Sequence, residues 1–330
     1  MVSLLRSNHH GVPVLTLLIL GIFGAIPWVF PSQETVMPGG SMPLMEVLYQ
    51  SLGSGASLWQ AISIVLTIAQ AALLIGWNQK YDILPRVYFL PGFTYVLISC
   101  SLPSVPEMVP AMIFGFVLSS ALIYLMGSLR QEFSSFHAIG ATLLLTLASF
   151  LYLWGIAYVL VVWIFLMYLR SWSWREMVGS LLGIILPVFL TMSLLYLSEA
   201  DLTGIIQDIY TAHWIHTASI TNWPLSVWVL LGFMGLLFLI SFPTLAGTMQ
   251  TARSISRKGF SLMTTVAVVT IVLFLILPGY HPELYWILAI PLAMVYAGLF
   301  SLMRSRKWAN ILIFTWITLI LWVRIHLIFI

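Results

Sequence analysis

The residues best suited to chemistry lie in polar segments between long apolar runs. The first such segment, residues 31–57, holds two carboxylates, Glu34 and Glu46, and neither Lys nor Arg. A carboxylate partly shielded by protein at a membrane surface can act as a general base or hold a divalent cation. The alternative for Glu34 is a solvated loop glutamate. Glu46 fits the polar face of a short amphipathic helix. The predicted lipid-facing side of that helix is Leu44, Met45, Leu48 and Leu52.

Two histidines stand out in the long polar segment 198–224. His213 and His216 are three residues apart, and therefore on one face of a helix, with Asp208 about a turn and a half earlier. An Asp/His/His group can bind a metal ion, but a HxxH pair without a third close ligand is a weak metal signal. Binding of a phosphate by the two histidines is somewhat more plausible than binding of a metal ion, and no metal ligand set is assigned.

The segment LPGYHPELYW, residues 277–286, places His281 and Glu283 at the head of an apolar run. Proline and glycine on both sides of His281 predict a rigid turn. Glu283 falls in the first turn of the helix that follows, where the helix dipole favours an acid. Helix capping and a role in binding a substrate are therefore both open for Glu283.

Arg324 is unusual because it lies inside the last apolar run, ILWVRIHLIFI. A charged side chain at membrane depth costs about 2.5–3.5 kcal/mol on insertion scales. The side chain therefore either snorkels to the surface or meets an anion. A guanidinium binds phosphate through a planar fork of donors. The sequence leaves both interpretations open.

The elements that must position these residues are transmembrane helices. Of the 330 residues, 61% are hydrophobic and 7% charged, whereas soluble domains carry about 25% charged residues. The apolar runs suit helices that cross hydrocarbon rather than the alternating strands of a barrel. The single Cys100 excludes an internal disulfide. We expect one all-α transmembrane domain over residues 1–330, and no nucleic-acid partner.

Hydropathy and turn residues predict about eleven spans. The predicted spans are 12–30, 58–77, 86–102, 108–127, 137–153, 156–169, 178–197, 225–246, 261–277, 284–301 and 309–328. The run 137–169 is interpreted as a short hairpin that turns at Trp154 and Gly155. With a cytoplasmic N-terminus, twelve of the thirteen Lys and Arg residues then fall inside, as the positive-inside rule expects. Only Arg324 lies toward the outer face. Seven of the ten acids fall outside, so we expect function at the outer face.

Residues 104–197 carry a resemblance to a known enzyme class. Ser104-Val-Pro-Glu107 leads into an apolar helix that ends at Arg130, and a short hairpin, a basic turn and GSLLGIILPVFL follow. This order resembles the middle of the membrane glycosyltransferases of the GT-C fold, which use polyprenyl-phosphate-linked sugars. The resemblance implies a GT-C-like bundle with the catalytic acid in the first outer loop, at Glu34. That class often has a paired acidic motif there, whereas this chain has Gln33-Glu34. The chain also resembles a family of bacterial multi-pass inner-membrane proteins of unknown function.

Three functions follow as hypotheses. The first is transfer of a sugar from a polyprenyl-phosphate carrier to an acceptor at the outer face of a bacterial inner membrane. Glu34 would activate the acceptor hydroxyl as a base, or through a divalent cation, and Glu283 would lie in the substrate site. The group neutralising the lipid phosphate would be Arg324 with His213, His216 and His281. A protein that keeps the GT-C-like fold but has lost the catalytic activity is also an open interpretation.

The second hypothesis is a non-catalytic partner subunit of an envelope protein assembly. The third is a transporter or lipid flippase, which the scarcity of ionisable residues in mid-span disfavours. Membrane lipids are expected partners in all three.

Overall fold

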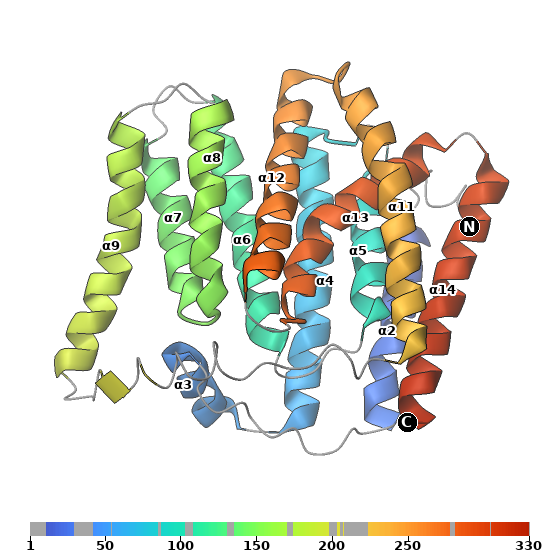
Figure 1. Ribbon diagram of the computed structural model, residues 1–330, viewed down its shortest axis with the longest axis horizontal. Helices are drawn as coiled ribbons and strands as arrows, with labels where there is room; N and C mark the ends of the chain where they lie inside the picture. Colours follow the sequence, from blue (N-terminus) through green and yellow to red (C-terminus); the bar gives the residue numbers. More distant parts are fainter. Residues whose placement is uncertain are drawn as a thin grey trace.

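The protein is described here by a computed structural model. The described residues are 11–29, 42–53, 55–84, 87–102, 108–130, 135–169, 174–197, 203, 204, 207, 224–277, 281–303 and 305–329. Within these ranges the regular elements are all helices, which pack side by side as one bundle (Figure 1). The prediction of an all-α fold is confirmed.

Seven helices in the described part of the chain are long and apolar enough to cross a membrane. They are α4 (Ala56–Tyr81), α6 (Val109–Gly127), α9 (Trp174–Leu197), α11 (Leu225–Met249), α12 (Ser254–Ile276), α13 (Leu284–Leu302) and α14 (Arg306–Phe329). A spanning helix needs roughly 20 apolar residues, which these runs supply. The chain is therefore a multi-pass helical membrane protein. The number of crossings stays a prediction.

The other helices include one of 19 residues, as long as α6 and α13, and four shorter ones. They are α2 (Gly11–Val29), α3 (Pro43–Leu52), α5 (Leu90–Ser101), α7 (Ser135–Ser149) and α8 (Val159–Leu169), with the 3-10 turns η2 (Ser128–Arg130) and η3 (Leu153–Tyr158). Each of the eleven predicted spans thus coincides with a helix. With about 1.5 Å of rise per residue, the 12 residues of α5 cover about 18 Å. All 12 are buried, so α5 ends inside the protein.

The predicted hairpin is present as α7, η3 and α8. Its turn comes slightly earlier than expected, at residues 150–152. Gly155 lies in η3, where a Cβ would overlap the ring of Phe114, so glycine allows the hairpin to approach α6 closely. The 15 residues of α7 and 11 of α8 are too few to cross about 30 Å of hydrocarbon. The hairpin tip stops short of the lower ends of α4 and α9 (Figure 1).

Helix α3 covers the hairpin tip (Figure 1). Met45 and Tyr49 are buried and form a small apolar cluster with Trp59 and Val109, against which Leu151 and Leu153 of the tip pack. The Tyr49 and Trp59 rings lie 4.5 Å apart between centroids.

The prediction that one apolar face of α3 lies in lipid is partly wrong. Met45 is 1% exposed and Leu48 packs on the same cluster, whereas Leu44 and Leu52 are exposed. A short helix with apolar residues on several sides can bury any of them, and its contacts with the hairpin tip, Trp59 and Val109 determine which.

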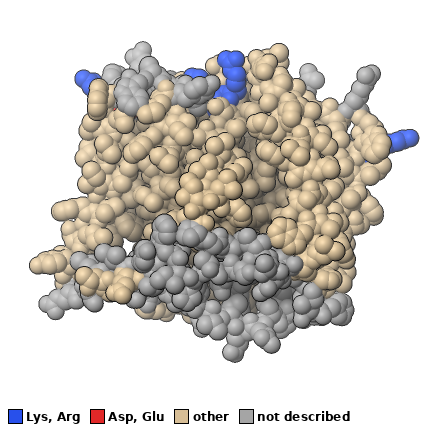
Figure 2. All heavy atoms as spheres, in the orientation of Figure 1, with Lys and Arg blue, Asp and Glu red and all other residues tan. Residues whose placement is uncertain are grey.

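Basic side chains gather at one end of the bundle. Figure 2 shows the described Lys and Arg side chains of the visible face along the upper part of the molecule. At this end α4, α6 and α11 finish and α9, α12 and α14 begin (Figure 1). The grouping agrees with the charge pattern used to predict the topology. That this end faces the cytoplasm, and the N-terminus with it, stays a prediction.

Helix α9 lies at the edge of the bundle and packs mainly on α7 (Figure 1). Small residues make up most of its buried face, which consists of Glu176, Gly179, Ser180, Gly183 and Pro187. A Cβ on Gly183 would lie 2.7 Å from the backbone oxygen of Ile139. Small residues let membrane helices approach closely, and here they fix α9 against the hairpin.

Candidate functional site

The structure describes three of the six predicted site residues. Glu34, His213 and His216 lie outside the described residues. The backbone of Glu46 belongs to α3, but its side chain is not described. Arg324, His281 and Glu283 are described with their side chains, and they do not form one group.

Arg324 is buried, with 7% of its surface exposed, so the snorkelling interpretation is wrong. Its Nη2 atom donates hydrogen bonds to the backbone oxygens of Cys100 (3.2 Å) and Leu102 (3.0 Å). The guanidinium therefore caps the C-terminus of α5, a role that neither sequence interpretation included. Binding of a phosphate by Arg324 stays a prediction.

The position of Arg324 follows from the short length of α5. The last carbonyl groups of a helix have no partner within it, and hydrocarbon offers no water to replace that partner. Tyr285 supplies another donor, from its hydroxyl to the oxygen of Ile98 at 2.9 Å. A cation is also favoured at the negative end of the helix dipole. The buried charge thus has a structural explanation.

His281 and Glu283 form a pair at the opposite end of the bundle from the basic residues. The His281 Nδ1 atom lies 3.0 Å from Glu283 Oε1, and the two side chains are 11% and 22% exposed. Glu283 occupies the N-cap position of α13, but its side chain makes no capping hydrogen bond there, and its Oε1 atom pairs with His281 instead. With Nδ1 donating to the carboxylate, Nε2 of a neutral imidazole is left as an acceptor. This Nε2 atom is buried and has no hydrogen-bond partner among the described residues.

The hairpin tip covers this pair. The Trp154 ring meets His281 edge-on, with 5.6 Å between centroids. Tyr152 is buried, and its hydroxyl has no hydrogen-bond partner among the residues that the structure describes. Glu283 lies close enough to act electrostatically on this tyrosine. Buried polar atoms without protein partners often mark positions of water or ligand. We name Tyr152, Trp154, His281 and Glu283 the tip cluster.

Packing behind the tip cluster is tight. The Phe114 ring contacts those of Tyr152 and Tyr158, at 5.8 and 5.3 Å between centroids. The Tyr158 hydroxyl lies 2.8 Å from Thr270 Oγ1 on α12. These contacts tie the hairpin to α6 and α12, so the Tyr152 hydroxyl is held in place by a rigid support. A rigid support is what a binding site requires.

The tip cluster can exchange a proton or bind an anion. A histidine oriented by a carboxylate is a suitable acid or base, and its protonated form donates a charge-assisted hydrogen bond to phosphate. The described residues contain no group of three or more His, Cys, Asp or Glu that could hold a metal ion. The proposed divalent cation therefore stays a prediction that depends on residues outside this part.

Sequence reasoning identified His281 and Glu283 but missed Tyr152 and Trp154. It treated both aromatic residues as parts of an apolar hairpin. A usable signal was present: a hairpin too short to cross the membrane must leave its tip inside the protein, so polar atoms at the tip need partners.

Comparison with known proteins finds no match for this chain. No protein-family model, curated protein or solved structure matches the chain, so both resemblances described above stay predictions.

Proposed function

We propose that this protein transfers a sugar from a polyprenyl-phosphate carrier to an acceptor hydroxyl, at the face of a bacterial inner membrane opposite the basic end. The supporting observation is the buried His281–Glu283 pair, whose Nε2 atom lacks a partner among the described residues. The geometry supports the phosphate-binding part of this proposal. The sugar and the polyprenyl carrier come from the GT-C resemblance.

In the proposed reaction, the acceptor oxygen bonds to the sugar C1 as the bond from C1 to the phosphate oxygen breaks. Glu34 takes the acceptor's proton, and the carrier phosphate leaves with the bonding electron pair. Protonated His281, held by Glu283, donates a hydrogen bond from Nε2 to that phosphate. Tyr152 supplies a second donor. Arg324 would act on the phosphate only through guanidinium atoms other than Nη2, because Nη2 already caps α5.

The test is binding of a polyprenyl monophosphate to the purified protein in lipid nanodiscs. We expect His281→Gln to weaken binding by about 10- to 150-fold, since a hydrogen bond to a charged group contributes about 1.5–3 kcal/mol. Tyr152→Phe should weaken binding less and should not lower the unfolding temperature, because its buried hydroxyl has no hydrogen-bond partner among the described residues. His137→Gln, at the start of α7 and stacked on Tyr124 at the basic end, is the control. Equal binding by the His281→Gln variant and the parent protein would refute the phosphate role.

Catalysis is tested separately through Glu34. Loss of surface glycan in cells that carry Glu34→Gln, with normal protein levels, is the expected result. Unchanged glycans would reject the transferase proposal even if polyprenyl phosphate binds.

A second candidate is a partner subunit of an envelope assembly. Helix α9 favours it, because much of its surface is exposed and apolar, for example at Ile185, Phe189 and Leu194. Polar substitutions at these residues should then reduce recovery of a partner in pull-downs, whereas outer carboxylates would be dispensable.

A further inference from the structure

We propose that a groove between α7 and α9, at the basic end of the bundle, binds an anionic phospholipid. The lipid phosphate lies against Arg175, and one acyl chain lies along Ile139, Val178 and Leu182. This inference is independent of the proposed transferase, because the tip cluster lies at the other end.

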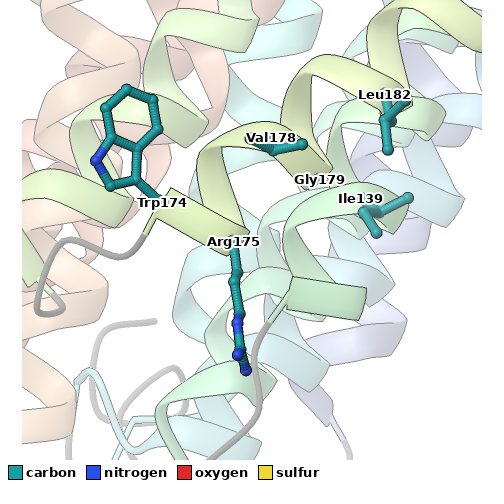
Figure 3. Close-up of a pocket in the computed structure, with 6 residues that line it drawn as sticks. All are labelled: Ile139, Trp174, Arg175, Val178, Gly179 and Leu182. Carbon is teal, nitrogen blue, oxygen red and sulfur yellow. The ribbon is translucent and has the colours of Figure 1, made fainter.

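The groove has a volume of about 410 Å³ and is lined by Ile139, Trp174, Arg175, Val178, Gly179 and Leu182. This volume lies within the range of ligand pockets, about 300–1,000 Å³. Ile139, Val178 and Leu182 form its apolar wall, and Trp174 and Arg175 lie at the start of α9 (Figure 3). Gly179 carries no side chain that would fill the groove.

The charge at the mouth of the groove suits an anion. Arg175 is exposed and makes no ion pair among the residues that the structure describes. Its side chain extends away from Val178 and Leu182 (Figure 3). The neighbouring Glu176 is buried, on the face of α9 that packs into the bundle. The backbone N–H groups that begin a helix also favour a phosphate.

The apolar wall identifies the occupant as a lipid rather than a free anion. Val178 and Leu182 follow Trp174 at intervals of four residues, so they form a row along α9 below the charged mouth. Val178 is 49% and Leu182 53% exposed, which leaves them available to an acyl chain. Trp174, 74% exposed, has the amphipathic ring that is enriched at headgroup level. Basic residues at a membrane surface attract anionic lipids.

The test is lipid binding to the full-length protein in detergent, measured by native mass spectrometry with phosphatidylglycerol and phosphatidylcholine of identical chains. We expect tighter binding of phosphatidylglycerol, by about fivefold for one cation near the headgroup. Arg175→Gln should abolish this preference. Arg257→Gln, an exposed cation of α12, should preserve it. The unfolding temperature of each lipid-free variant shows whether the fold is intact.

A second variant tests the acyl-chain contact. Val178→Trp should fill the groove and lower binding of both lipids. Equal affinity for the two lipids in the parent protein would overturn the proposal, as would loss of the preference in the Arg257→Gln variant. Competition by millimolar inorganic phosphate that removes all bound phosphatidylglycerol would reassign the site to a free anion.

Discussion

Replacement of Arg324 by Met tests whether this buried charge caps α5. The variant keeps a long apolar side chain but removes both hydrogen bonds that Nη2 donates to the oxygens of Cys100 and Leu102. Each buried acceptor left without a partner costs about 1–3 kcal/mol, so two cost about 2–6 kcal/mol. Arg324 Nε is itself buried without a partner among the described residues, and its removal returns about 1–3 kcal/mol. With the midpoints of the two ranges, the expected net loss of stability is about 2 kcal/mol.

The assay is the free energy of unfolding in detergent, with Lys307→Met as the control at the other end of α14. That residue is exposed, and its replacement should change stability by less than about 0.5 kcal/mol. Arg324→Lys keeps the charge but not the fork of donors, so its loss should be intermediate. An Arg324→Met variant as stable as the parent, but with weaker polyprenyl phosphate binding, would refute the capping argument and restore the anion interpretation.

Two further predictions concern helix packing. Gly183→Leu should detach α9 from α7 and cost about 1–3 kcal/mol of stability, because even a Cβ would lie 2.7 Å from the oxygen of Ile139. The control is Gly247→Leu, since a Cβ on Gly247 would meet open space. Met45→Ala should cost about 2–5 kcal/mol and Val47→Ala much less, since Met45 is 1% and Val47 62% exposed. If the two variants of a pair had equal unfolding temperatures, the packing contact assigned to Gly183 or to Met45 would be contradicted.

The sequence was informative about where helices lie. Long apolar runs between polar turns predict helices directly, and each predicted span coincides with one. The short hairpin was also predictable, because any single-span interpretation of 137–169 moves later basic residues to the wrong side. The N-terminal part of α9 was missed: its first residues, including Trp174 and Arg175, are helical but too polar to belong to the predicted span.

Contacts between distant segments were not predictable. Arg324 caps a helix more than 220 positions away, and no local pattern indicates that α5 ends inside the protein. The pair of His281 and Glu283 could be proposed because the two residues are neighbours in the chain. The contribution of Tyr152 depends on the packing of the hairpin tip, which helical periodicity does not encode.

The shortness of α7 and α8 has a consequence for how the protein is made. Neither helix alone matches the roughly 20 apolar residues that a spanning segment needs, so neither is a strong stop-transfer signal when the chain is inserted into the membrane. The main packing partner of α7 is α9, which it meets at Gly183, and that of α8 is α12. Both partners emerge from the ribosome after the hairpin. The hairpin must therefore wait for two later helices, α9 and α12, before it settles in the bilayer.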